Sequence, residues 1–424
     1  MSKYQRKVMV GDLEVGMYVS KLDCPWHQTP FPLQGFHVET KEDVNSLKAY
    51  CKHVFVDVSR SRAKTVFQPK KPLTPEERAA RAIAKSTAPL VANPIKYEIT
   101  SPLKKEIKQA KLVYADLNKN LTELTEQFET DANVDLEKTF TCSRSVVKSV
   151  LSNPEALVWV IKLKNNANSL YQHSINCAVW AAVVGRELGL TEAKLEKLTT
   201  GVMLSKIGLM SMTKGKEVNF VKLRESDHYK KHVLLAIKLL SHSSGLCKTI
   251  LETIATHEEH YDGQGFPNQL QGEQIPLFGQ IAGMVDYFES STNPIFCSQP
   301  LSPTEALSRL YQLRDMQFSE RLIEAFIQCL GLYPPGTIVE LSTQEIGIVT
   351  SNQKQKRLQP DVMIIMNKDR KPLRSTKTID LQAINKDKIQ DLVEITCSLP
   401  VGTFGIEPHQ YQYANDSLIS RLFG

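Results

Sequence analysis

The sequence has few features of a secreted, membrane-spanning or nucleic-acid-binding protein. No apolar stretch approaches the roughly 18 to 20 residues that cross a bilayer, and the first residues lack the apolar segment of a signal peptide. The eight cysteines include no C-x-x-C pair, so neither a zinc knuckle nor a disulfide framework is indicated. Basic residues exceed acidic ones only by 52 to 46, which predicts no strong footprint for duplex nucleic acid. We therefore expect a cytoplasmic protein with no membrane span.

The composition is that of a globular protein with more than one domain. The chain has 424 residues, of which 42% are hydrophobic and 23% charged, which is enough for two or three separate cores. Residues 1–65 contain two period-two stretches, typical of half-buried strands, around a short helix. Thr40 and Asp43 have the spacing of a capping box for this helix, and Val44 and Leu47 follow at helical spacing. These residues predict a small α+β domain.

The rest of the chain divides by composition into three further parts. Residues 66–98 are basic and proline-bearing with little periodicity, which is typical of a linker. Residues 99–331 have helix-period apolar spacing, and residues 332–424 contain short β-branched runs bounded by Gly, Pro and Asn. We therefore predict a multidomain protein: an all-α domain flanked by the N-terminal α+β domain and a small C-terminal β module.

Histidines are concentrated in the helical part of the chain. Six of the ten histidines fall within 88 residues: His173, His228, His232, His242, His257 and His260. His232 is followed by Leu235 and Leu239, so its imidazole points along the buried face of a helix, and His173 and His257 lie on similar apolar stripes. A buried imidazole needs a partner. For any one of them, a hydrogen-bonded core histidine is the simpler interpretation.

Asp286 adds a carboxylate to this set. It lies in the apolar helical segment QIAGMVDYF, where an ionised carboxylate is costly unless it is paired or bound to metal. Three histidines and an aspartate that converge in a helical core would suit a divalent transition metal. Before any family is considered, the metal site and ordinary core pairing are about equally supported.

A distinctive loop follows the last of these histidines. The sequence HEEHYDGQGFP places two glycines and a proline close together directly after a helix, and Pro276 begins another helix. A plain connection between helices is the ordinary interpretation of such a segment. Its position after the histidines favours a role at a site.

Together these segments resemble the HD-GYP family of metal-dependent cyclic di-GMP phosphodiesterases. The resemblance covers residues 140–331 and rests on the order YQHSI, a helix-borne histidine, HEEHYDGQGFP and IPLFGQIAGMVDYF. It implies a helical domain in which two or three iron or manganese ions activate water. It also agrees with the flanks, because a small N-terminal domain of unknown function and a C-terminal β extension accompany one HD-GYP subfamily.

Matched to this family, the chain keeps some metal ligands and lacks others. The retained ligands are His173, His232, His257 and Asp286. The family's His-Asp pair is replaced by Ser205 and Lys206, and the first histidine of its His-His pair by Thr256. The resemblance also places Leu209 at a phosphate-contacting lysine and Gln280 at an arginine. The signature loop is better preserved, and it is associated with nucleotide binding and with docking to diguanylate cyclase domains; its residues here are Asp262, Gly263, Gly265, Phe266 and Pro267.

Three functions compete on this evidence. The first, which we favour, is a catalytically impaired HD-GYP signalling protein without a metal cofactor, which binds a diguanylate cyclase domain, another signalling protein or cyclic di-GMP. The second is an active phosphodiesterase for cyclic di-GMP or a related cyclic dinucleotide, with a single divalent iron or manganese on the four retained ligands. The third is a helical scaffold without a ligand. A metal could also be held by unmatched residues, for instance His228, His242, His260 or Glu258.

Lys206 leads to the most specific hypothesis. Its ammonium could occupy the place of the lost cation and pair with Asp286, because a buried lysine and a buried aspartate would each offset the other's desolvation. In the alternative, Lys206 extends its amine to solvent and Asp286 bonds to a backbone amide or to Ser205. An amine within about 4 Å of the Asp286 carboxylate separates the two.

Overall fold

The computed structural model describes residues 5–24, 29, 35–57, 60–61, 90–130, 136–163, 169–241, 243–293, 295–351, 359–386, 391–406, 408 and 411. These residues form two compact units, Met1–Ala88 and Pro89–Gly424. Each unit has a hydrophobic core of its own.

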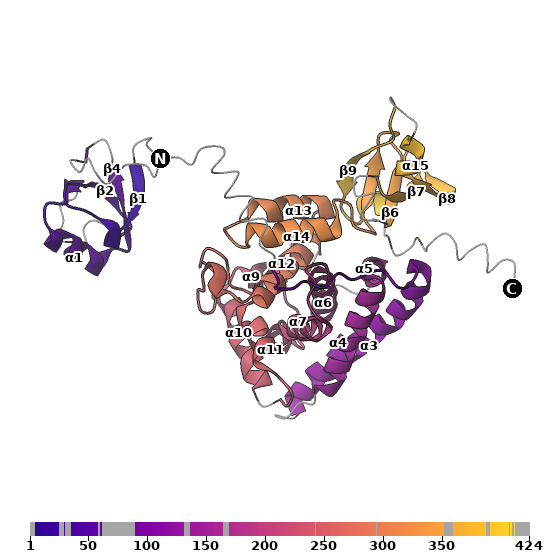
Figure 1. The fold of residues 1–424 in the computed structure, drawn as a ribbon, viewed down its shortest axis with the longest axis horizontal. Helices are drawn as coiled ribbons and strands as arrows, with labels where there is room; N and C mark the ends of the chain where they lie inside the picture. Colours follow the sequence, from indigo (N-terminus) through magenta and orange to yellow (C-terminus); the bar gives the residue numbers. More distant parts are fainter. Residues whose placement is uncertain are drawn as a thin grey trace. The chain divides into compact units, whose positions relative to one another are not determined.

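The described residues of the first unit form a four-stranded antiparallel sheet and one α-helix (Figure 1). Its strands, in the order β1-β4-β2-β3, are β1 (Gln5–Met9), β2 (Tyr18–Leu22), β3 (Phe36–His37) and β4 (His53–Asp57). Helix α1 (Lys41–Tyr50) begins at the expected capping box of Thr40 and Asp43 and buries Val44 and Leu47. The predicted α+β fold is confirmed.

The second unit begins with a helical domain. Its α-helices are α3 (Leu103–Thr130), α4 (Glu137–Ser152), α5 (Pro154–Leu163), α6 (Leu170–Glu187), α7 (Glu192–Leu204), α8 (Ile207–Thr213), α9 (Phe220–Arg224), α10 (Asp227–Leu240), α11 (Lys248–Thr256), α12 (Leu277–Thr292), α13 (Pro303–Gln312) and α14 (Glu320–Leu330). Among the described residues between 151 and 331, only isolated bridges have β pairing. This confirms the predicted all-α domain.

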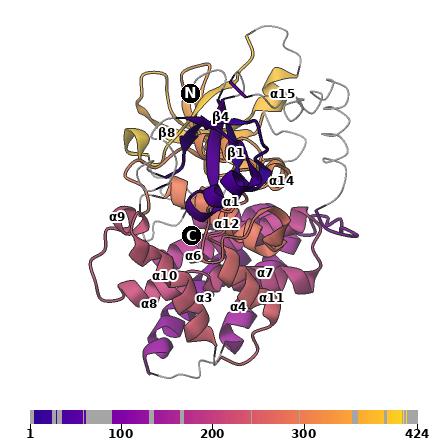
Figure 2. The same ribbon diagram turned by 90° about the vertical axis from the view of Figure 1, so that its left-hand side faces the viewer.

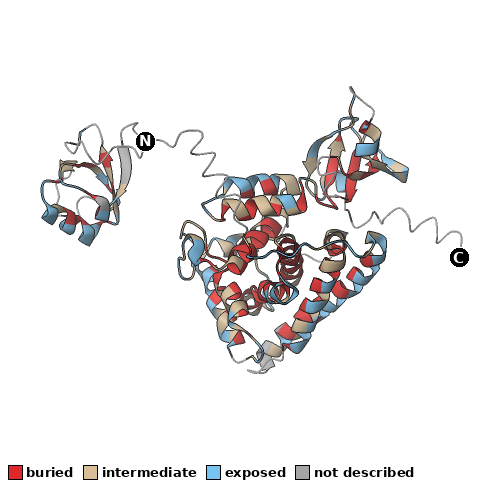
Figure 3. Cartoon of the chain, in the orientation of Figure 1, coloured by how far each residue is buried: buried red, intermediate tan, exposed pale blue. Residues whose placement is uncertain are grey.

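Helix α6 is the centre of this domain. Its residues from Gln172 to Arg186 are all buried (Figure 3), because α7 and α12 pack along it. Two further pairs of helices pack near His173: α8 lies beside α10, and α11 lies beside α7 (Figure 2). A helix that is covered on all sides can hold a polar side chain away from water, and α6 holds His173 in this way.

After α14, the described residues of the second unit form a five-stranded antiparallel sheet with one short α-helix. The strands, in the order β8-β7-β6-β5-β9, are β5 (Ile338–Leu341), β6 (Ile346–Ser351), β7 (Asp361–Met366), β8 (Pro372–Asp380) and β9 (Ile395–Leu399), and α15 (Leu381–Asn385) follows β8. Trp159 of α5 packs with Ile338, Ile346 and Ile348 of this sheet. Its indole Nε1 donates to the carbonyl oxygen of Thr350 at 2.7 Å.

The predicted linker lies mostly outside the described residues. Its described part, residues 90–98, contacts the helical domain: Ile95 donates its main-chain N–H to the carbonyl oxygen of Gly189, and the Tyr97 hydroxyl donates to that of Leu190. Within the part of the chain that the structure describes, no helix has both the length and the apolar character needed to cross a membrane.

Candidate functional site

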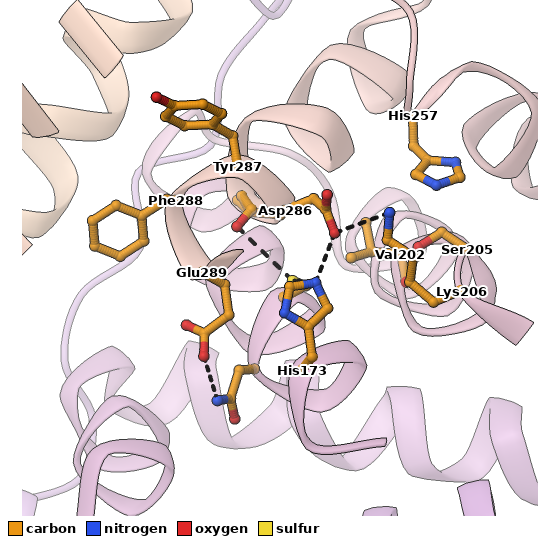
Figure 4. A network of polar contacts seen from close by, with 12 residues as sticks. His173, Val202, Ser205, Lys206, His257, Asp286, Tyr287, Phe288 and Glu289 are labelled. Atoms are coloured by element: carbon orange, nitrogen blue, oxygen red, sulfur yellow. Dashed lines mark hydrogen bonds and ion pairs between the residues drawn. The ribbon is translucent and has the colours of Figure 1, made fainter. Parts of the chain in front are cut away.

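Five parts of the helical domain bring polar side chains together around α6. We call these side chains the central cluster: His173 on α6, Lys206 between α7 and α8, His232 on α10, His257 and Glu258 after α11, and Asp286 on α12. Figure 4 shows His173 and Lys206 reaching the Asp286 carboxylate from different segments of the chain. All six are buried, so their charges and hydrogen bonds must be satisfied inside the protein.

Asp286 is the acceptor on which the cluster converges. Its Oδ1 lies 2.7 Å from Nε2 of His173 and 3.2 Å from Nζ of Lys206. Its other oxygen, Oδ2, lies 3.7 Å from a guanidinium nitrogen of Arg224. An ionised carboxylate only accepts, so Nε2 of His173 carries the proton and donates it to Asp286. That nitrogen therefore has no lone pair to offer a metal ion.

Lys206 lies between Asp286 and a second carboxylate. Its ammonium donates to Oε1 of Glu258 at 2.7 Å and to the Tyr229 hydroxyl at 3.1 Å, and that hydroxyl donates to the same Glu258 oxygen at 2.7 Å. Lys206 is only 1% exposed, so its amine does not extend to solvent. Ser205 donates its hydroxyl to the Val202 carbonyl and not to Asp286. Of the two hypotheses for Lys206, the structure contains the ion pair with Asp286, and Glu258 adds a second carboxylate to it.

Lys206, Asp286 and Glu258 stabilise one another's charged forms. Burial alone would lower the pKa of Lys206, but the carboxylates of Asp286 and Glu258 raise it well above its ordinary value. Burial alone would raise the pKa of each carboxyl, but the Lys206 ammonium lowers that of Glu258 and, together with His173, that of Asp286. All three groups are therefore ionised at neutral pH. With Arg224, the group holds two positive and two negative charges.

His232 and His257 form the other half of the cluster. Their Nδ1 atoms lie 2.6 Å and 2.7 Å from the carbonyl oxygens of Tyr229 and Ile254, so Nδ1 of each ring carries the proton. Burial and the Lys206 ammonium lower the pKa of His257 and lower that of His232 to about 3. Both rings are therefore neutral at pH 7, and their Nε2 lone pairs face each other at 3.2 Å.

The donors of the cluster do not fit a pair of metal ions. The Lys206 ammonium lies where the resemblance would place a bridging carboxylate, and His173 donates where a ligand would accept. The cluster offers better donors to a single divalent ion. Oε1 of Glu258 lies 3.6 Å and 3.7 Å from Nε2 of His232 and of His257, so these three side chains would hold the ion and supply it with two imidazoles and a carboxylate.

The other positions that differ from the family have ordinary structural roles. The Thr256 hydroxyl donates to the Glu252 carbonyl within its own helix. Leu209 is fully buried in the hydrophobic core, and the Gln280 amide donates to the Ile275 carbonyl. None of these side chains offers a ligand or a phosphate contact.

The signature loop packs against the central cluster. Phe266 donates its main-chain N–H to the Glu258 carbonyl, and its ring lies 6.2 Å from the ring of His232. A Cβ atom at Gly265 would overlap main-chain atoms of His260, so only glycine allows this approach. Asp262 accepts from the main-chain N–H of Gln264 at 3.0 Å, which stabilises the turn.

Two unmatched histidines are not part of any ligand group. His228 is exposed on the first turn of α10, and His260 is half-buried before the loop; neither joins a group of three ligand-type side chains among the described residues. His242 lies outside the described residues. Glu258, which the sequence suggested only as an unmatched ligand, directly follows His257 and belongs to the central cluster.

The structure adds three residues to the predicted site. Tyr229 could have been found, because it lies three residues before His232 on the same helical face. Cys177 could have been found in the same way, since it lies one turn after His173 and places its sulfur 3.5 Å from Nε2 of that ring. Arg224 had no signal in the sequence, because it belongs to a short separate helix.

Comparison with known families defines the class of this protein. Residues 159–321 match the HD domain family, and residues 338–396 match a KOW domain associated with HD domains. Residues 5–139 match a domain of unknown function, DUF3391. The central part of the chain is therefore an HD domain, with the two companion domains that the resemblance implied.

Individual relatives narrow this class. The chain is 23% identical over 380 residues, 89% of each chain, to the cyclic di-GMP phosphodiesterase PA4108 of Pseudomonas aeruginosa. It is 27% identical over 188 residues, 43% of this chain and 49% of the relative, to the cyclic di-GMP phosphodiesterase PdeB of Borreliella burgdorferi. Among solved structures, Bd1817, an HDG"Y"P protein from Bdellovibrio bacteriovorus, matches with a TM-score of 0.41 and 15% identity over 76% of this chain and 98% of that chain. The chain thus has an HD domain between an N-terminal domain of unknown function and a C-terminal KOW domain associated with HD domains, and its relatives include cyclic di-GMP phosphodiesterases.

Proposed function

We propose that this chain is a catalytically impaired HD-GYP signalling protein that acts by binding a partner protein or a cyclic dinucleotide. One observation carries the proposal: the Lys206 ammonium is buried within 3.2 Å of Asp286 and 2.7 Å of Glu258. A covalently attached cation thus neutralises the carboxylates that would otherwise attract a metal pair.

The charge balance supports a loss of hydrolysis. Phosphodiester hydrolysis at a metal centre needs a cation that polarises the phosphate and lowers the pKa of bound water. An ammonium can do neither, since it coordinates no water and is saturated here by Glu258, Asp286 and the Tyr229 hydroxyl. A second cation beside Lys206 would meet its charge at short range, and even an effective dielectric constant of about 20 makes this repulsion a few kcal/mol.

The preserved loop supports a binding role. It is held by main-chain hydrogen bonds, and Glu259 stabilises it further by accepting from the N–H groups of Asn268 and Leu270 at 2.7 Å and 2.9 Å. At the edge of the site, Arg224 leaves 31% of its side chain exposed. A guanidinium in this position suits the phosphate of a cyclic dinucleotide.

Hydrolysis and binding assays on the full chain test the proposal. Purified protein is incubated with cyclic di-GMP and either Mn²⁺ or, without oxygen, Fe²⁺, and the products are separated by chromatography. Binding is measured by calorimetry with cyclic di-GMP and with an isolated diguanylate cyclase domain. We expect no turnover above a protein-free control and saturable binding of one of the two. Turnover by the unmodified chain, or the absence of both kinds of binding, would contradict the proposal.

A second candidate function is supported by the two facing histidines. The Nε2 lone pairs of His232 and His257 and the carboxylate of Glu258 are one set of donors for a single divalent iron or manganese. A phosphodiesterase with such an atypical site would lose turnover in His257→Ala. The same assay therefore distinguishes the two candidates.

A further inference from the structure

The N-terminal unit contains a second group of metal-ligand side chains, far along the sequence from the central cluster. Ligand atoms of Asp23, Cys24 and Cys51 all lie within 4.8 Å of one another. The two sulfur atoms are 3.2 Å apart, and Nδ1 of His53 lies 3.2 Å from Oδ2 of Asp23. Two sulfurs and a carboxylate oxygen therefore lie together, and the His53 imidazole lies beside the carboxylate, outside the group of three.

The fold of this unit explains how they meet. Strands β2 and β4 pair in antiparallel register, with Leu22 opposite Val54, so the end of one strand lies beside the start of the other. Cys51 is the C-cap residue of α1 and lies two residues before the start of β4. The Asp23 carboxylate accepts the main-chain N–H groups of Lys52 and His53, each at 3.0 Å. Main-chain hydrogen bonds thus fix Asp23 beside the start of β4, where His53 lies.

We propose that Asp23, Cys24, Cys51 and His53 bind one Zn²⁺ ion. Zinc prefers four ligands of these types in a tetrahedron, with bonds of about 2.3 Å to sulfur and about 2.0 to 2.2 Å to nitrogen and oxygen. A tetrahedron of these bonds separates two sulfurs by about 3.8 Å, and a nitrogen from an oxygen by about 3.4 Å. The two observed separations of 3.2 Å need to open by less than about 1 Å.

A metal site would stabilise this unit, because its hydrophobic core is small. Among the described residues, the core contains eleven buried hydrophobic side chains, and Cys51 is one of them. Domains of this size bury a small share of their surface and often rely on a disulfide or a structural metal. Zinc would join the end of β2 to the junction of α1 and β4, so its binding energy would stabilise the folded unit.

A disulfide between Cys24 and Cys51 is the rival use of the same thiols. A disulfide would use only the two sulfurs, whereas a metal ion would also use the Asp23 carboxylate and the His53 imidazole beside it. A divalent cation supplies the positive charge that this group of potential anions lacks, and both thiol protons leave to solvent when it binds.

The test measures zinc in the full chain. Protein is equilibrated with Zn²⁺, freed of excess metal by gel filtration and analysed by mass spectrometry, in the His257→Ala background so that the central cluster lacks a donor. We expect about one zinc per chain, falling to about zero in Cys24→Ser and His53→Ala. The matched controls Cys397→Ser and His37→Ala, which change the same residue types away from the four donors, should keep the metal.

A second measurement remains informative if a variant fails to fold. Co²⁺ bound to the same protein should give an intense sulfur-to-metal charge-transfer band, because two of its ligands are thiolates. Unchanged zinc content in folded Cys24→Ser and His53→Ala would overturn the proposal. A Cys24–Cys51 disulfide would also overturn the proposal. It would be detected as a loss of two free thiols in protein purified without reductant.

Discussion

Replacing Lys206 with methionine would remove the positive charge between two buried carboxylates and keep most of the side-chain volume. At an effective dielectric constant of about 20, the ammonium attracts Glu258 at 2.7 Å by about 6 kcal/mol and Asp286 at 3.2 Å by about 5 kcal/mol, before desolvation is subtracted. Breaking a buried pair from one side typically costs about 3 to 5 kcal/mol. We expect Lys206→Met to destabilise the helical domain by that amount at pH 7.

The pH dependence of this effect has a defined sign. In the unmodified chain, the lowered carboxyl pKa values add stability that is present above about pH 4.5 and is lost as pH falls through the folded values. The raised pKa of Lys206 adds stability that is present below about pH 10 and is lost as pH rises through its folded value. Stability from this group is therefore flat near neutrality. Without Lys206, burial raises the carboxyl pKa values, so the variant should become more stable as pH falls from 8 to 5.

The assay is urea unfolding followed by circular dichroism at pH 5, 7 and 8. Lys230→Met is the matched control, because Lys230 makes an exposed ion pair with Asp227 and its loss should change the free energy of unfolding by less than about 1 kcal/mol. Adding Glu258→Gln to Lys206→Met should restore part of the lost stability. A cost below about 1 kcal/mol for Lys206→Met, with no pH dependence, would refute the reasoning.

Three further predictions concern the metal, the loop and the domain junction. The double change Ser205→His with Lys206→Asp should raise the manganese content of the folded chain, and unchanged content by elemental analysis would show that other positions prevent binding. Gly265→Ala should destabilise the folded protein by about 1 to 3 kcal/mol and weaken ligand binding in calorimetry, because its Cβ would overlap main-chain atoms. The control Gly263→Asn should change neither stability nor binding, because asparagine tolerates the positive φ of 80° at this position. Trp159→Phe should lower stability by about 1 to 3 kcal/mol in thermal unfolding, because a buried carbonyl loses its donor; an unchanged melting temperature would show that this bond is not needed.

Local patterns in the sequence were enough to predict the elements and part of the site. The start of α1 followed from two side chains three residues apart, and the structure contains that capping box. His173, His232 and Asp286 lie on apolar helical stripes, so helical periodicity alone placed them inside the protein. Such predictions work where an interaction depends on spacing along one helix.

Contacts between distant segments could not be predicted in this way. Glu258 lies beyond the end of α11, where helical periodicity no longer gives a direction for its side chain. Cys24 and Cys51 are 27 residues apart and meet only because β2 pairs with β4. The eight cysteines looked scattered because the relevant spacing is set by the sheet and not by a short motif.

The position of Trp159 has a consequence for how the chain can be divided. Trp159 belongs to helix α5, but its ring packs in the core of the C-terminal sheet with Ile338, Ile346 and Ile348. A chain cut after α14 at Leu330 would keep every residue of the HD domain match and still uncover a large indole whose Nε1 has lost the Thr350 carbonyl. The smallest fragment that retains the native environment of α5 therefore includes the C-terminal strands, although no residue of the central cluster lies on them.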